Sequence, residues 1–507
     1  MMPISRRSAL RTFGCLTAPM LVHRSEAQVT PDVVSYAPEI EPLVTLMERT
    51  PREKCAEMLV AQLRQGVSYR QLMAALFLAG IRNINPRPPG FALHCVFVIH
   101  SAHLISLEAP PESRLLPLFY AMDTFKASQE RDARQAGGDF VLRRPNGPLF
   151  APATAAREFA SAMETWDIER AQRAAISLAR SRNAAEVFGS LWQYGARDYR
   201  NIGHKAIFVA NAERTLRVIG WQHAEPVLLS LVSGILDFGK DQQVNGYAFA
   251  DQCYSANVKR MNAFAKLGDG TWAAKSADPD VTRAVVGEIR AATVEDACSA
   301  VNERLSKGSA GAASIWDAVH LAAAELRMRV SGGASIIGIH AVTACNALHH
   351  AYLTSSDPAV RYLLLLQAVG WMGQFKTWAE TRKDDVRTLS ILDIEQSPAN
   401  MESEGKIAEM FADLASRPDA SAPRIMRLAR NVRAKQSFLS TAVRLTLAKA
   451  DEVHYYKYLA ALIEDTALTT GEWQPHLYAA LAYYTKGSTD PEPAWAKSAR
   501  AALGGLA

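Results

Sequence analysis

Apolar side chains recur every three to four residues along most of the chain, with polar side chains between them. Residues at i, i+3, i+4 and i+7 share one face of an α-helix, so this spacing predicts amphipathic helices. The helices predicted in this way are Cys55–Gln65, Tyr69–Ala79, Phe91–Leu107, Ala155–Glu164, Ile168–Ala179, Ala184–Tyr194, Lys205–Ile219, Val227–Leu236, Ala313–Val330, Ile339–Leu353, Ala359–Gly370, Ser437–Ala450 and Val453–Leu468. Strict alternation, which indicates strands, is almost absent. The pattern therefore predicts an all-α fold, built as a multi-helix α/α array or a large helical bundle with long loops.

One short stretch departs from the helical pattern. The apolar runs Phe140–Arg143 and Leu149–Phe150 flank the turn-forming sequence Pro145–Pro148, which contains Asn146-Gly147. Turn residues between two apolar runs are typical of a β-hairpin. The sequence thus predicts at most a small hairpin here.

Three stretches rich in Gly, Pro, Asp and Asn are predicted to be loops or insertions, namely Ala127–Pro152, Phe238–Asp280 and Lys383–Pro423. They divide the chain into helical segments, which are 28–126, 153–237 and 281–507. No strict repeat period is visible, and we expect the segments to pack as one continuous unit. A helix start is legible where Asp357 can cap the helix that Pro358 begins.

Composition excludes several classes of protein. Of the 507 residues, 49% are apolar and 21% are charged, as in ordinary globular proteins. The net charge of +5 is spread along the chain without long Lys/Arg blocks, so no nucleic-acid partner is expected. Beyond the first residues no uninterrupted apolar run reaches the roughly 18 residues of a spanning helix, so no transmembrane segment is expected in the mature chain.

The N-terminus resembles a twin-arginine (Tat) export signal. Ser5-Arg6-Arg7 with Leu10 and Arg11 matches the S-R-R-x-F-L-K pattern, with Ala9 where Phe is usual. An uncharged stretch, Thr12–Val22, is too short to span a bilayer, and Ser25-Glu26-Ala27 has the small residues that a signal peptidase prefers. We therefore predict a signal peptide at residues 1–27 and a periplasmic mature protein. The alternatives are a disordered basic tail on a cytosolic protein and a lipoprotein anchored at Cys15.

Six cysteines lie far apart, without a C-x-x-C pair or a haem attachment motif. Cys15 would leave with the signal, so an odd number remains and at least one is unpaired. Most occupy apolar helical surroundings, where buried free cysteines are common. A structural disulfide stays open, without a pair that the sequence identifies.

All but one of the twelve histidines follow the predicted signal, and several fall at helix starts or on shared faces. Imidazole is the commonest ligand of transition metals, and helical bundles build such sites from inward-facing side chains. The sequence therefore predicts a His-rich site for a transition metal, with iron or copper favoured. The candidate ligands are His100, His103, His204, His223, Glu225, His340 and His350. The alternative is that each histidine caps a helix or satisfies one buried hydrogen bond.

Motifs for other chemistries are missing from the chain. It contains no G-x-S-x-G elbow, Walker loop, G-x-G-x-x-G fingerprint or H-E-x-x-H helix. A metal-independent hydrolase therefore has no recognisable nucleophile. The aromatic run His454–Tyr458 can line a pocket or belong to the core.

Two segments resemble questin-oxidase-like proteins. They are Ile202–Ile207 with Gly220–Leu228, and Ile339–Thr343 with Ala347-Leu348. Members of that family are helical, and the fungal ones are linked to oxidative ring opening of anthraquinones, so the resemblance implies an oxidase. The family tends to have a second histidine four residues after the first, and this position is Phe208 here.

A broader resemblance links Tyr69–Leu72, Gly80–Ile84 and Ala121–Lys126 to Tat-exported proteins of environmental bacteria, for which it implies no activity. Together these observations lead to the hypothesis of an exported helical oxidoreductase with a His-rich metal site. Its substrate would be an apolar or aromatic small molecule. The alternative is a non-catalytic helical-repeat protein that binds a partner in a groove. No motif identifies the substrate, the metal or the oligomeric state.

Overall fold

The computed structural model describes most of the chain after the predicted signal. The described residues are 33–134, 138–238, 248–251, 253–264, 271–382, 385–395, 404–414 and 416–504. Their regular structure is helical, apart from two isolated antiparallel bridges, Val33 with Arg143 and Val330 with Val386. The prediction of an all-α multi-helix array is confirmed.

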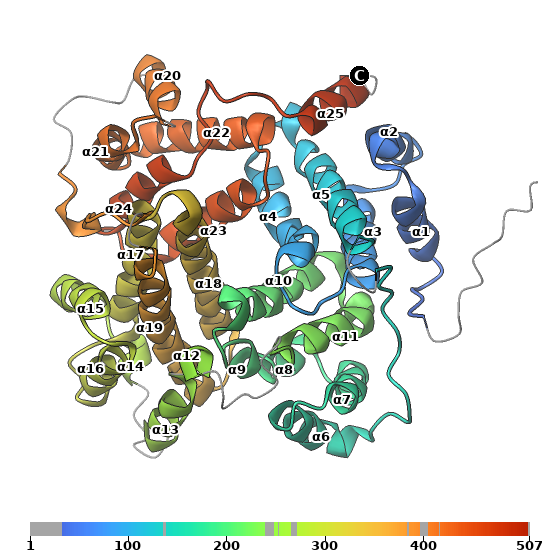
Figure 1. Ribbon diagram of the computed structural model, residues 1–507, viewed down its shortest axis with the longest axis horizontal. Coiled ribbons are helices and arrows are strands. Elements are labelled where there is room, and N and C mark those ends of the chain that lie inside the picture. Colours follow the sequence, from blue (N-terminus) through green and yellow to red (C-terminus); the bar gives the residue numbers. More distant parts are fainter. Residues whose placement is uncertain are drawn as a thin grey trace, which may run out of the picture.

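The first half of the chain forms the blue to green side of the molecule (Figure 1). Its α-helices are α1 (Glu41–Arg49), α2 (Cys55–Arg64), α3 (Tyr69–Asn83), α4 (His94–Glu108), α5 (Leu116–Asp132), α6 (Pro152–Glu164), α7 (Ile168–Ser181), α8 (Ala184–Gly189), α9 (Trp192–Gly195), α10 (His204–Ile219) and α11 (Ala224–Ile235).

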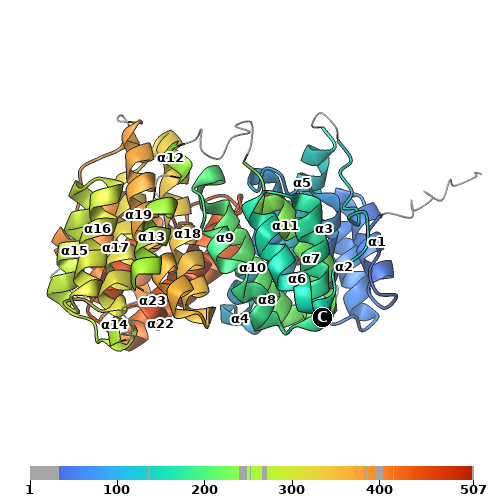
Figure 2. The same ribbon diagram turned by 90° about the horizontal axis from the view of Figure 1, so that it is seen from below.

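The second half forms the yellow to red side, and Figure 2 shows the two halves next to each other. Its α-helices are α12 (Ala248–Asp251), α13 (Tyr254–Phe264), α14 (Thr271–Ala274), α15 (Pro279–Ala291), α16 (Val294–Ser306), α17 (Ala312–Arg329), α18 (Ser335–Thr354), α19 (Pro358–Glu380), α20 (Glu404–Asp413), α21 (Pro418–Leu428), α22 (Val432–Lys449), α23 (His454–Leu468), α24 (Gln474–Ala480) and α25 (Ala494–Gly504). The last helix, α25, returns to the first half and packs on α2 and α5.

Four helices join the two halves at the centre of Figure 1. Helix α4 packs against α10 and α23, and α18 packs against the same two helices. His94, His204 and His454 are the first residues of α4, α10 and α23, and their rings lie together with that of His340 of α18. Residues further along the same four helices line one cavity. The residues nearer the start of each helix contact one another, and so do the residues further along. The four helices therefore run in the same direction.

The predicted helix start at Asp357 is confirmed. Its carboxylate accepts hydrogen bonds from the backbone N–H groups of Ala359 (2.8 Å) and Val360 (3.4 Å), and Pro358 is the first residue of α19. A side chain that accepts from the first free N–H groups stabilises a helix by about 1 kcal/mol.

The predicted hairpin at Phe140–Phe150 is wrong. Leu142 bonds instead to residues distant in sequence: its N–H donates to the Arg82 carbonyl (2.8 Å) and its carbonyl accepts from Val34 (3.0 Å). The second arm is held against α7, where the N–H of Phe150 donates to Ser177 Oγ (3.0 Å). Tertiary partners therefore outweigh the local preference of the Asn-Gly turn.

The predicted loop at Phe238–Asp280 is corrected in part, because it contains α12, α13 and α14. Packing explains the ordered part: Phe264 stacks on Tyr362 at 4.0 Å between ring centroids, and Trp272 meets the same ring at 5.4 Å. Similarly, the predicted loop at Lys383–Pro423 contains α20 and the start of α21.

One helical stretch, Phe91–Glu108, is long and apolar enough to cross a membrane by length and composition, and 67% of that window is buried inside the protein. Burial among neighbouring helices accounts for its apolar character. The described cysteines, Cys55, Cys95, Cys253, Cys298 and Cys345, are all buried and free.

Candidate metal centre

Three buried histidines from three helices converge on one point. The Nε2 atom of His204 lies 3.0 Å from Nε2 of His94 and 2.9 Å from Nε2 of His340. One donor nitrogen from each ring lies within 4.8 Å of the other two, and together they form a group that can hold a metal ion.

Backbone hydrogen bonds fix which nitrogen carries the proton in two of these rings. His204 Nδ1 lies 2.6 Å from the Asn201 carbonyl, and His340 Nδ1 lies 2.7 Å from the Ile336 carbonyl. A carbonyl only accepts, so each Nδ1 is the donor, and in the neutral rings each Nε2 carries a lone pair. The two lone pairs face each other across 2.9 Å.

Protonation does not relieve this arrangement easily. Burial, reinforced by the nearby positive charge of Lys457, lowers the pKa of His94, His204 and His340 well below the ordinary histidine value. The rings are therefore neutral near pH 7. His94 has the further feature that its Nδ1 is buried without a hydrogen-bond partner in the described part of the chain.

A strained backbone segment presents His204. Asn201 (φ +56°), Ile202 (φ +51°) and Gly203 (φ +80°) are three successive residues in left-handed conformation immediately before α10. A β-branched residue in this region costs on the order of 1–3 kcal/mol. The segment turns the Asn201 carbonyl back onto His204 Nδ1, so the strain secures the orientation of the ring.

Two ionic contacts anchor this segment. Asp198 and Lys205 form a fully buried ion pair across it, with Oδ2 and Nζ 2.8 Å apart. The other Asp198 oxygen accepts from the N–H of Arg200 (3.0 Å), and the Arg200 guanidinium meets Asp251 at 2.6 Å. Removing one member of a buried pair leaves an uncompensated charge, so the strained turn is firmly held.

A fourth histidine lies beside the triad. The His454 ring centroid is 4.7 Å from that of His94 and 5.1 Å from that of His340. Its Nδ1 donates to Glu452 (2.6 Å), and its Nε2 is buried without a hydrogen-bond partner among the described residues. A carboxylate that orients an imidazole in this way is typical of histidines next to metals.

Lys457, one turn after His454, is a cationic side chain that acts on all three histidines of the triad. Its Nζ lies 5.6 Å from the Phe97 ring centroid and has no hydrogen-bond partner within the described ranges. Burial lowers the pKa of Lys457 to about 7, against the opposing effect of Glu452. This amine therefore exchanges a proton near neutral pH, beside three neutral imidazoles.

Two phenylalanine rings pack against the histidines of the triad, one exposed and one buried. Phe91 is 61% exposed, and its ring centroid lies 5.2 Å from that of His94. Phe97 stacks on His204 at 5.5 Å and meets Phe208 at 5.4 Å. The triad thus has an apolar side and lies away from solvent, which strengthens electrostatic interactions there.

Further along the four helices lies a polar cavity of about 20 Å³, lined by Lys457 among others. This volume is enough for about one water molecule. Arg214 closes the cavity with bonds to Asn346 (2.8 Å) and Glu464 (3.0 Å), and His100 meets the other Glu464 oxygen at 3.3 Å.

The structure brings two of the seven predicted ligands, His204 and His340, into the triad. The other five lie outside it with different partners. His350 bonds to Glu213 (2.8 Å), Glu225 forms an ion pair with Arg180 (2.7 Å), and His100 meets Glu464. His103 contacts the Tyr69 hydroxyl at 3.4 Å, and His223 contacts Gln222 at the same distance.

The sequence prediction did not include His94, His454 or Lys457. His94 lies on the same predicted helix as His100. Only His100 and His103, which share a helical face at i, i+3, were chosen as candidates. His454 and Lys457 lay in an aromatic run whose local pattern fits a core equally well. Only the register between helices distant in sequence selects them.

Comparison with known proteins found no family model, curated protein or solved structure that matches the chain.

Gly203 allows a test of the strained turn. A Cβ atom there would lie 2.8 Å from Ala344 Cβ and 3.3 Å from Trp371, at a φ of +80°. We expect Gly203→Ala to lower the free energy of unfolding by about 1–3 kcal/mol. Gly287→Ala is the matched control, because that position in α15 has open space. It should raise stability by about 0.5–1 kcal/mol. Urea denaturation of both variants measures these changes. Equal changes in the free energy of unfolding would contradict the role of the turn.

The neutral triad also predicts a pH dependence of stability for the metal-free protein. The folded-state pKa values are depressed, whereas the unfolded histidines titrate near about 6.5. Below that pH the unfolded chain binds more protons than the folded protein. The contribution of these histidines to the free energy of unfolding is therefore complete above pH 6.5 and is lost as the pH falls.

Each histidine contributes up to about 1.4 kcal/mol per pH unit. Replacing one of them, as in His94→Leu, should reduce the slope by this amount between about pH 6 and about pH 5. Urea midpoints measured across this range test the expectation. An unchanged slope would show that His94 is already protonated in the folded protein.

Proposed function

We propose that the protein is a metalloprotein in which His94, His204 and His340 hold one transition-metal ion through Nε2. The facing lone pairs of His204 and His340 carry this proposal. Two acceptor nitrogens 2.9 Å apart repel each other unless a proton or a cation lies between them, and burial disfavours the proton. A metal ion satisfies all three rings at once.

The donor set supports a transition metal. The Nε2 atom of His204 lies 2.9 Å from that of His340 and 3.0 Å from that of His94, so the three nitrogens are close enough to share one ion. Imidazole is a ligand of iron, copper, nickel and zinc, and we favour iron or copper because these metals change oxidation state. His454, with its free Nε2 and its Glu452 partner, is the candidate for a fourth nitrogen.

We extend the proposal to an oxidoreductase that acts on an apolar or aromatic small molecule. Imidazole ligands suit iron and copper, which change oxidation state, and Phe91 and Phe97 give the site an apolar side. The resemblance of Ile202–Ile207 and Ile339–Thr343 to questin-oxidase-like proteins supports the same class. Lys457, whose pKa is about 7, would hold or release a proton beside the centre.

Elemental analysis tests the metal. Purified mature protein from metal-replete cells should contain about one transition-metal ion per chain. His204→Ala and His340→Ala should each weaken binding by about tenfold or more, because they remove donors outright. His223→Ala is the matched control: it lies at the start of α11, outside the triad, and should keep the metal. Circular dichroism checks that all variants remain helical.

A wild-type protein without stoichiometric metal would overturn the proposal and favour the non-catalytic binding protein. The oxidoreductase step needs a separate readout. The loaded metal should be reduced by dithionite and reoxidised by air, as followed by its absorption spectrum. A metal that binds but does not change oxidation state would retain the metalloprotein and exclude the redox activity.

We also propose that the Tat pathway exports the protein. The triad joins residues 94, 204 and 340, so the chain must fold before the centre can form, and Tat export of folded proteins is compatible with loading before transport. Changing Arg6 and Arg7 together to Lys should hold the precursor in the cytoplasm, as seen by cell fractionation. Arg11→Lys is the control, since it restores the usual lysine and should export normally. Periplasmic protein trimmed near Gln28 in the double variant would exclude the Tat assignment.

A further inference from the structure

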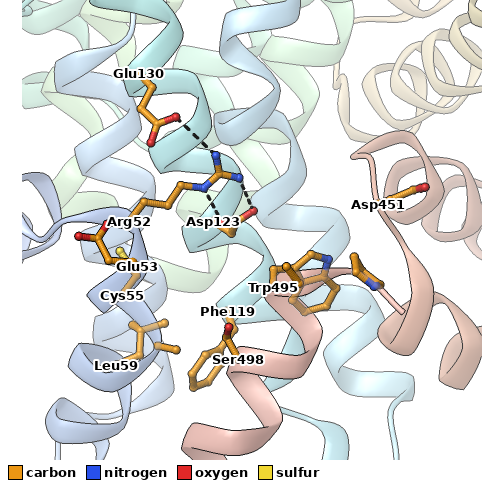
Figure 3. Close-up of a pocket in the computed structure, with 13 residues that line it drawn as sticks. Arg52, Glu53, Cys55, Leu59, Phe119, Asp123, Glu130, Asp451, Trp495 and Ser498 are labelled. Atoms are coloured by element: carbon orange, nitrogen blue, oxygen red, sulfur yellow. Dashed lines mark hydrogen bonds and ion pairs between the residues drawn. The ribbon is translucent and has the colours of Figure 1, made fainter. Parts of the chain in front are cut away.

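A groove of about 540 Å³ lies on the surface between α2, α5 and α25 (Figure 3). Its volume falls in the range of about 300–1,000 Å³ typical of small-molecule sites. In Figure 3, Arg52 and Glu53 stand on one side, Asp451 on the other, and Trp495 between them. None of these residues belongs to the metal centre.

The charged groups that line the groove are mostly carboxylates. Four acidic side chains line it, those of Glu53, Asp123, Glu130 and Asp451, against the single guanidinium of Arg52. Arg52 is held by Asp123 at 2.7 Å and 2.8 Å and by Glu130 at 3.4 Å. Glu130 also pairs with Arg134 (3.7 Å) and Asp451 with Lys486 (2.8 Å), so the four carboxylates outnumber these cationic partners by one.

A fixed aromatic platform provides the apolar part of the groove. The Trp495 Nε1–H donates to the Ala450 carbonyl (2.7 Å), which fixes the indole ring. Tyr120 packs edge-on against Trp495 at 5.0 Å and stacks on Tyr456 at 4.3 Å, so the ring is supported from behind. Phe119 and Leu59 also line the groove, although both are almost fully buried.

We propose that this groove binds an organic cation, an amine or guanidinium attached to an aromatic body. Carboxylates only accept hydrogen bonds from such a head group, and tryptophan is the aromatic side chain that attracts cations most strongly. The apolar wall receives the body of the ligand. Anions are repelled by the same carboxylates. The groove is separate from the metal centre, so ligand binding there does not depend on the proposed metal.

The test compares three probes with the purified mature protein. 2-Phenylethylamine has the charge and the ring, 3-phenylpropionate has the ring with the opposite charge, and butylamine has the charge without the ring. Ligand-observed NMR and tryptophan fluorescence report binding. The aromatic amine should bind with a millimolar or lower Kd, at least about fivefold more tightly than either other probe.

Variants locate the site. The double variant Glu53→Gln, Asp451→Asn should weaken binding of 2-phenylethylamine by about threefold to tenfold through the loss of charge. Trp495→Phe, which keeps an apolar ring at this position, should also weaken it. The matched control is Glu57→Gln on the same helix as Leu59, a carboxylate outside the groove that should leave the affinity unchanged. Equal binding of amine and carboxylate, no binding of the amine at about 10 mM, or an unaffected double variant would overturn the proposal.

Discussion

The arrangement at the centre of this protein depends on two imidazole nitrogens that face each other, each with a lone pair and without a proton between them. His204 and His340 donate Nδ1–H to backbone carbonyls, which leaves their Nε2 atoms as acceptors 2.9 Å apart. Burial disfavours an imidazolium ion, so the contact is compatible with a metal ion held between the two nitrogens. The parallel course of α4, α10, α18 and α23 is the feature of the fold that brings these nitrogens together. The strained turn before α10 is the local cost of that orientation.

The electrostatics of the surroundings also favour neutral imidazoles. Three of the helices begin at this point, and helix N-termini carry partial positive charge that opposes protonation of nearby imidazoles. Lys457 adds a further unfavourable interaction with an imidazolium. Glu452 balances this on the side of His454, where it fixes the ring by a 2.6 Å hydrogen bond. Neutral, oriented nitrogen donors are the outcome, and these are the form in which histidine binds metals.

Helical periodicity predicted the all-α fold, and the Asp357 cap predicted one helix start correctly, because both depend on neighbours within a few residues. The same local reasoning selected His204 and His340, because the first falls at a helix start and the second shares a helical face with His350. It missed His94 and His454, whose importance depends on how helices more than a hundred residues apart are aligned. The Phe140–Phe150 hairpin failed for the same reason, since Leu142 finds its partners at Arg82 and Val34. Local sequence thus specifies elements, and tertiary register specifies the site.

The two ends of the central helices differ in a way that determines access to the centre. Toward the C-terminal ends, the ion pair of Arg214 with Glu464, together with Asn346, fills the space down to a cavity of about one water molecule. Opening that end would expose a buried guanidinium and its partners, which is costly. At the other end the barrier is the exposed Phe91 ring, held by contact with Arg131 at 4.2 Å. Moving a surface aromatic ring costs far less than breaking a buried ionic network, so the Phe91 end is the more easily opened of the two.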